Sequence, residues 1–187
     1  MPRVKHVKAR KDYPDQGIVK GEMYYYTKMK TGPRSSKVMR SKTPFTQSQL
    51  TNSPFKQAWY GMQEEWERGD KDAEAITAAA EAIREIGEEA QNNFDNMPEG
   101  LQQGDTGQMI ENRANEAERI ADELDTLAQE LTDLEEPDEM EEPVESEEND
   151  PDGWAAFEQW QEEHDHYQSE LARIPEEAGD LIGDMPE

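Results

Sequence analysis

The chain of 187 residues contains no cysteine, which excludes disulfides and thiolate metal sites. It also lacks a run of about 20 apolar residues, the length that a membrane-spanning helix needs. The basic N-terminus is not followed by the apolar segment of a secretory signal. We therefore expect a cytoplasmic protein that does not associate with membranes.

Apolar residues are scarce as well. Only 33% of the chain is hydrophobic, whereas 34% is charged. Little apolar surface is then available to offset the conformational entropy that folding removes. We expect a small sheet, a helical hairpin and disordered parts instead of one large core.

Positive charge is concentrated at the N-terminal end. Residues 1–42 hold twelve Lys and Arg against three Asp and Glu, whereas residues 43–187 hold seven against forty-two. The whole chain has a net charge of -26. A basic head on an acidic body indicates an arm that binds nucleic acid or one that docks on acidic protein, its own body included.

The strongest structural signal lies between residues 70 and 134, where apolar residues recur three and four positions apart. This spacing makes a stripe along one helix face. The first stripe consists of Ile76, Ala79, Ala80, Ile83, Ile86, Ala90 and Phe94. The second has heptad, coiled-coil-like spacing and consists of Ile110, Ala117, Ile120, Leu124, Leu127, Leu131 and Leu134.

Each stripe is the nearest partner of the other, so the sequence predicts a long antiparallel helical hairpin. Asp70 would cap the first helix, which should end near Met97, and residues 98–104 would form the turn. Asp105 or Thr106 would cap the second helix, with Gln108 completing a capping-box-like pair. The hairpin could be self-contained or could pair with a second copy in a four-helix bundle, as a homodimer.

The basic head is expected to contain a β-hairpin. Residues 1–20 predict a mobile basic arm. Residues 22–30 favour a strand, with Met23, Tyr25, Thr27 and Met29 on one face and Tyr24, Tyr26, Lys28 and Lys30 on the other. A turn at 31–34 would lead into a second strand at 35–41, on which Val38 and Arg40 share one face and Lys37 and Met39 the other. Two strands are marginal in water, so this sheet should pack on the helices.

The remaining segments follow in order. Residues 43–53 indicate a connector, and Ser53-Pro54 a helix start, with Gly69 as a stop. Residues 135–152 predict a disordered acidic linker, since residues 133–150 contain eleven acids and no base. An aromatic amphipathic helix should follow at 154–174, with the last dozen residues frayed. The predicted fold is mainly α, divided into a head (1–52), a helical hairpin body (53–134), the linker (135–152) and a C-terminal helix and tail (153–187).

Cations beside aromatics point to nucleic acid, because phosphates bind the cations and bases stack on the rings. The alternative is that the tyrosines form a core and the lysines solvate the sheet. The candidate nucleic-acid-binding residues are Lys8, Arg10, Lys11, Tyr24, Tyr26, Lys28, Lys30, Arg34, Lys37, Arg40 and Lys42.

The C-terminal helix is the second candidate, because an aromatic stripe suits a groove on a partner protein. Docking on the chain's own hairpin is the alternative. The candidate partner-binding residues are Trp154, Phe157, Trp160, Tyr167 and Leu171. The acidic body could also imitate the field of DNA, although a solvated helix face and a solubilising tail are the commoner explanation of such runs. We find no phosphate loop, activated nucleophile, metal site or cofactor signature, and we expect no enzyme.

Several segments resemble a group of small tailed-bacteriophage proteins to which no activity is assigned. They are VKHVKARKD (4–12), KGEMYY (20–25), SKTP (41–44), SQLT (48–51), DNMPEGLQ (95–102) and GQMIENR (107–113). The resemblance covers about residues 3–134 and implies a phage accessory protein acting in the host cytoplasm. No residue inherits a role from it.

Two functions therefore remain open, and a structural role in the virion is a third, less favoured one. In the first, the basic head contacts DNA or RNA, and the acidic C-terminal region tunes that contact. In the second, the protein binds a host or phage protein and inhibits or redirects a DNA-binding machine.

Overall fold

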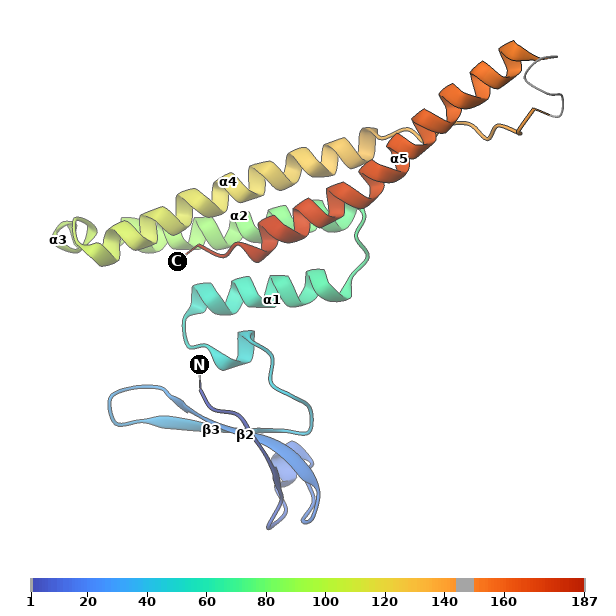
Figure 1. The fold of residues 1–187 in the computed structure, drawn as a ribbon. Coiled ribbons are helices and arrows are strands. Elements are labelled where there is room, and N and C mark those ends of the chain that lie inside the picture. The colour runs from blue at the N-terminus through green and yellow to red at the C-terminus, as the bar shows by residue number, and fades with distance from the viewer. Residues whose placement is uncertain (1, 144–149, 187) are drawn as a thin grey trace. The chain divides into compact units, whose positions relative to one another are not determined.

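The computed structural model describes residues 2–143 and 150–186. It is mainly helical with a small antiparallel sheet at the N-terminal end (Figure 1), which confirms the predicted fold class. The chain forms two compact units, residues 1–65 and residues 66–187. The strands are β1 (Lys5–Lys8), β2 (Met23–Lys30) and β3 (Ser36–Ser41), and the helices are α1 (Pro54–Arg68), α2 (Ala73–Asp95), α3 (Glu99–Gln102), α4 (Asp105–Asp133) and α5 (Pro151–Gly183).

The sheet has the order β1-β2-β3, with both pairs antiparallel. The β2–β3 hairpin is confirmed, and Lys28 lies directly opposite Val38 while Tyr26 lies opposite Arg40. Since directly paired residues point to the same side of a sheet, the predicted division of the two faces holds.

The predicted mobile arm is wrong, because residues 5–8 pair with β2 and residues 9–20 form an ordered loop after them. Strand β1 pairs Val7 with Tyr24, and the following loop closes through a bridge between Tyr13 and Ile18. Ala9, Ile18 and Tyr24 are buried together as a small core. The apolar residues of this core are separated by cations and turn residues. They therefore show neither helical nor strand periodicity, and the sequence pattern does not predict them.

Strand β2 is buried on both faces. Tyr24 faces the small core, whereas Thr27 and Met29 are buried on the opposite side. The Thr27 hydroxyl donates a hydrogen bond to the backbone carbonyl of Arg3 at 3.3 Å, which satisfies the one polar side chain buried there.

Helix α1 begins and ends where its sequence predicts. The Lys56 N–H donates to the Ser53 hydroxyl at 3.4 Å, and Gly69 follows the last helical residue. The connector before α1 is held by Ser48, whose backbone N–H and hydroxyl donate to the Glu64 carboxylate at 3.1 and 3.0 Å. Trp59 and Met62 are buried.

Helices α2 and α4 form the predicted hairpin and lie side by side (Figure 1). All predicted core residues of α2 are buried except Phe94, which is half-buried. Small residues bring the helices close: a Cβ on Gly87 would lie only 3.1 Å from the Cβ of Ala117. On the exposed side, Arg84 bridges the helices by donating to Asp125 at 2.7 Å and Asp122 at 3.2 Å.

The helix caps differ from the prediction. Asp72, and not Asp70, caps α2, because its carboxylate accepts the Ala75 N–H at 2.8 Å. Helix α4 starts at Asp105 after Gly104 and has no side-chain cap, so the expected cap and its pairing with Gln108 do not form. The chain turns tightly onto Gly107, where a Cβ would lie 2.5 Å from the Cα of Gln102. Gly107 is therefore required by packing.

Helix α5 is longer than predicted, and the expected fraying of the last dozen residues is wrong. Ile174, Ala178 and Ile182 are at most 1% exposed and lie at helical spacing on the part of α5 that packs on α4. Arg173 joins the same contact by donating to Glu130 at 3.1 Å. The C-terminal half of α5 is thus a third helix of the second unit's core.

The predicted acidic linker is only partly described. Residues 134–143 contain no helix or strand, and residues 144–149 lie outside the described residues. Pro151 and Asp152 already belong to α5, and the Asp150 carboxylate caps that helix by accepting the Gly153 N–H at 3.0 Å.

Candidate functional site

The outer part of the β2–β3 hairpin carries a cluster of exposed cations. Strand β1 pairs only with residues 23–26 of β2, so the hairpin continues beyond them as a two-stranded ribbon. No acidic residue occurs between positions 23 and 63 of the sequence. The exposed cations of this cationic ribbon are Lys28, Lys30, Arg34 and Lys37.

These cations lie on different faces of the ribbon. Lys28 and Lys30 alternate with the buried Thr27 and Met29, so they point away from the buried face. Lys37 lies on the other face, opposite Met29, and Arg34 lies in the turn. The ribbon can therefore contact a polyanion with its exposed face and its tip.

Lys5 belongs to the same exposed surface but is missing from the sequence-based set. It is exposed, and it lies opposite Tyr26 on the face that also carries Lys28. The signal that could have placed it is the alternation of residues 5–8, which is too short to stand out in a basic segment.

Tyr24 is not a stacking platform, contrary to the prediction. Its ring is 6% exposed and lies 5.6 Å from the ring of Tyr13, measured between centroids. Burial and then the hydrogen bond with Tyr13 raise the pKa of Tyr24, and the same bond lowers the pKa of Tyr13.

Arg40 belongs to this tyrosine cluster as well. Its guanidinium lies 4.4 Å from the centroid of the Tyr13 ring, and the residue is half-buried. Tyr26 is half-buried against the same core. Arg40 therefore supports the sheet by a cation–π contact and is less accessible to phosphate than the ribbon cations.

Lys8, Arg10, Lys11 and Lys42 are exposed but lie elsewhere on the first unit. Lys8 pairs with Met23 at the far end of β2, and Lys11 lies 5.6 Å from the Tyr13 ring. Lys42 forms an ion pair with Glu22 at 3.3 Å. The Val19 N–H and Lys42 lower the pKa of Glu22. The predicted set therefore divides into the cationic ribbon and a second group near β1.

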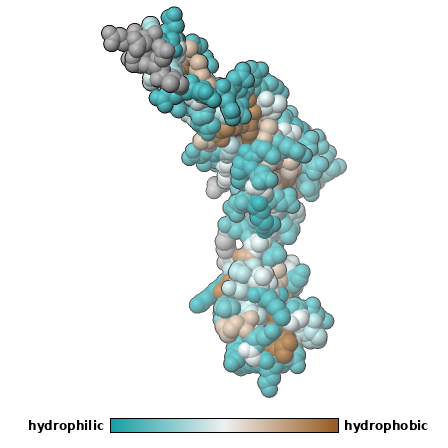
Figure 2. Space-filling model, turned by 90° about the vertical axis from the view of Figure 1, so that its right-hand side faces the viewer, coloured by the Kyte–Doolittle hydropathy of each residue, from teal (hydrophilic) through white to brown (hydrophobic). Residues whose placement is uncertain are grey.

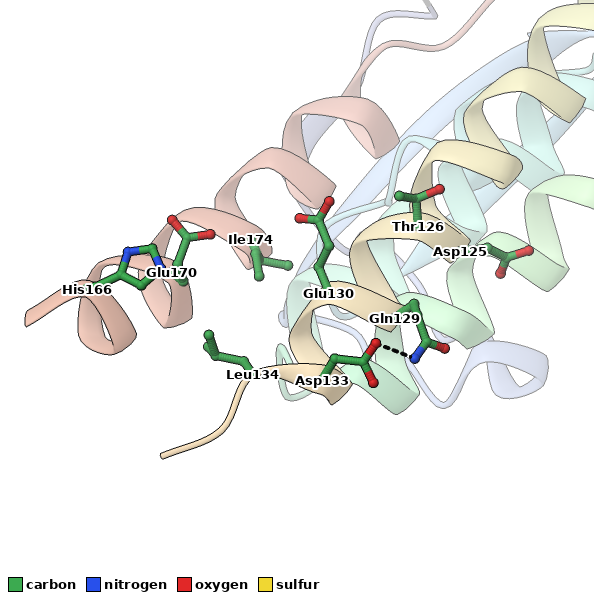
Figure 3. Close-up of a pocket in the computed structure, with 9 residues that line it drawn as sticks. All are labelled: Asp125, Thr126, Gln129, Glu130, Asp133, Leu134, His166, Glu170 and Ile174. Carbon is green, nitrogen blue, oxygen red and sulfur yellow. Dashed lines mark hydrogen bonds between the residues drawn. The ribbon is translucent and has the colours of Figure 1, made fainter. Parts of the chain in front are cut away.

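In the second unit, an acidic groove runs between the end of α4 and α5 (Figure 3). Its volume is about 670 Å³, and it is lined by Asp125, Thr126, Gln129, Glu130, Asp133, Leu134, His166, Glu170 and Ile174. Its carboxylates already have partners: Gln129 donates to Asp133 at 2.8 Å, and Arg173 donates to both Glu130 and Glu170. Among the described residues, no group of three His, Asp or Glu is placed to hold a metal ion.

The predicted partner-binding residues lie on one stripe of α5. Consecutive rings are close, with centroid distances of 6.0 Å from Trp154 to Phe157, 5.6 Å from Phe157 to Trp160, and 5.1 Å from Trp160 to His164. These residues and Tyr167 are half-buried, and Leu171 is exposed. The structure therefore brings all five predicted residues together on one face.

One face of the molecule shows how its hydrophobic residues are distributed. The view in Figure 2 is mostly hydrophilic, with hydrophobic residues in small separate areas. In the described part of the chain, no helix combines the length and the apolar character that crossing a membrane requires. No protein-family model, curated protein or solved structure matches this chain.

Proposed function

We propose that this chain is a non-enzymatic protein that binds DNA or RNA through the cationic ribbon of its first unit. The observation that carries the proposal is the set of four exposed cations on an acid-free two-stranded ribbon. A ribbon of this kind fits the major groove of DNA, and its cations can also follow a phosphate backbone. Lys5 would add a contact from β1.

The acidic second unit would weaken this binding. Residues 66–187 hold forty acids against six bases, whereas residues 1–65 hold thirteen bases against five acids. Like charge on the same chain repels a polyanion at low ionic strength, and salt screens that repulsion over about 10 Å at 0.1 M. The second unit thus repels nucleic acid electrostatically and restricts binding to targets that contact the ribbon directly.

The test is fluorescence anisotropy with labelled single- and double-stranded DNA and RNA across a salt series. The ribbon variant replaces Lys28, Lys30, Arg34 and Lys37 by glutamine. The matched control replaces Lys8, Arg10, Lys11 and Lys20 by glutamine, which removes the same charge from exposed positions outside the ribbon. If the ribbon contacts four phosphates of a duplex, the ribbon variant should bind with a weaker salt dependence. The negative slope of the log of the association constant against log salt should become smaller in magnitude by about 3 to 4.

Equal losses in both variants would refute the ribbon as the interface, and absence of binding by the unaltered chain at low salt would refute the function. A third variant tests this repulsion. It replaces the six acids of residues 135–142 by glutamine and asparagine. It should bind more tightly at low salt and equally at high salt. Substitution is the right design here, because truncating the chain before α5 would remove Ile174 and Ile182 from the core.

A further inference from the structure

The N-terminal half of α5 is not used by the core of the second unit. The core contacts of α5 come from Ile174, Ala178 and Ile182. Figure 1 shows the other half of the helix continuing past the end of α4. This half carries the aromatic face, which we define as Trp154, Phe157, Trp160, His164 and Tyr167.

Residues 134–138, at the start of the acidic linker, lie along this half of α5. The Trp160 indole N–H donates to the backbone carbonyl of Asp138 at 2.7 Å. Between the linker and the helix is an acidic cleft of about 680 Å³. It is lined by Leu134, Glu135, Glu136, Pro137, Asp138, Glu163, His166 and Tyr167. Four carboxylates therefore meet an aromatic ring at the edge of the aromatic face.

The negative charge on this surface is not balanced by basic residues nearby in the sequence. Residues 120–172, which include the end of α4, the linker and the aromatic half of α5, contain no lysine or arginine. Glu158, Glu162 and Asp165 add further exposed carboxylates on the aromatic half itself. The described part of this surface thus presents aromatic rings and carboxylates, and no lysine or arginine is among the residues that line the cleft.

We propose that the aromatic face and the acidic cleft bind a lysine- and arginine-rich segment of a partner protein. Cations are attracted to the faces of Trp and Tyr rings, and a guanidinium pairs with carboxylates through parallel hydrogen bonds. The aliphatic stems of such side chains cover aromatic surface at the same time.

Charge complementarity selects this occupant over others. A nucleic acid would be repelled by the carboxylates, and an uncharged apolar helix would bury them without partners, which is costly. A basic segment offsets both effects. This inference goes beyond the proposed function and does not depend on it, because the two surfaces lie on different units of the chain.

The test is binding of a fluorescein-labelled peptide of alternating arginine and alanine to the full chain, followed by anisotropy. A chain with a net charge of -26 attracts any polycation, so the proposal rests on differences between variants. The aromatic variant carries Trp160→Ala and Tyr167→Ala. The cleft variant carries Glu135→Gln, Glu136→Gln and Glu163→Gln.

The matched control carries Glu74→Gln, Glu81→Gln and Glu85→Gln, which removes the same charge from exposed positions of α2. The aromatic and cleft variants should each raise the Kd on the order of tenfold, as expected for partly desolvated cation–π and charged contacts. The control should change it by less than about twofold, as exposed charges do. A peptide with glutamine in place of arginine should bind none of them.

Equal Kd values for the cleft variant and the α2 control would overturn the proposal, because binding would then follow net charge alone. Far-UV circular dichroism checks that each variant folds. If the aromatic variant does not fold, the comparison of the cleft variant with the α2 control still decides the test. Sedimentation without peptide provides a second test. Self-association of the chain that is lost in the aromatic variant would also overturn the proposal, since the occupant would be a second copy.

Discussion

Replacing Ile182 by alanine tests whether the last turns of α5 stabilise the second unit. Ile182 is 1% exposed, so its whole side chain has left water. Burying such a side chain contributes about 1.5–3 kcal/mol, and the cavity left by truncation adds to the loss. We therefore expect Ile182→Ala to lower the free energy of unfolding by about 2–5 kcal/mol.

Two further variants calibrate this value. Ile182→Val removes one methylene group and should cost about 0.5–1.5 kcal/mol. Leu171→Ala truncates a side chain on the same helix that is 37% exposed, and it should cost less than about 1 kcal/mol. The order of the three losses thus follows the amount of buried apolar side chain that each variant removes.

Urea unfolding followed by circular dichroism at the helix band measures these losses. With a slope of about 2 kcal/mol/M, the middle of the usual range, Ile182→Ala should lower the midpoint by roughly 1–2.5 M. A shift no larger than that of Leu171→Ala would refute the packing of the α5 C-terminus on the hairpin. It would restore the frayed end that the sequence predicts.

Three other predictions concern local structure. Gly107→Ala should lower the free energy of unfolding by more than about 1 kcal/mol, because the added Cβ would overlap the preceding turn. Gly61→Ala, in α1, should raise it by about 0.5–1 kcal/mol, since the added Cβ would meet no described side chain within 4 Å and alanine favours a helix. Thermal unfolding should show opposite shifts of the melting temperature. Asp72→Ala should cost about 0.5–2 kcal/mol through loss of the α2 cap, and Asp70→Ala much less; equal losses in urea unfolding would contradict the observed cap. The folded-state pKa of Glu22 is lowered, so its ionised form stabilises the fold above the ordinary glutamate pKa of about 4.3, and this contribution is lost as the pH falls through the lowered value. Glu22→Gln should therefore destabilise the chain at neutral pH, with a difference that shrinks below pH of about 4, as melting temperatures across a pH series would show.

The helical hairpin could be predicted because its signal is local and repeated. Residues such as Ile83 and Leu124 recur at helical spacing over many turns, and each stripe requires the other. The β2–β3 hairpin was predictable for a similar reason, since a turn signal separates two alternating segments. The aromatic face of α5 follows from the same helical periodicity.

Only the tertiary structure decided which of these faces are buried. Tyr24 and Lys28 share a face of β2, yet the loop after β1 covers the first and leaves the second exposed. The covering residues Ala9 and Ile18 are too few and too irregularly spaced to form a pattern. Tyr24 is therefore buried and Arg40 half-buried, whereas the four cations of the cationic ribbon remain exposed.

The end of α5 illustrates the same limit. A proline inside a helix removes one backbone hydrogen bond and crowds the preceding turn, so a sequence pattern favours an end near Pro175. The helix nevertheless continues to Gly183, because Ile174, Ala178 and Ile182 pack on the hairpin. The sequence determined where helices and strands form and where charge accumulates. Long-range packing decided which ends are ordered and which cations remain exposed, because burial depends on contacts between segments that are distant in the chain.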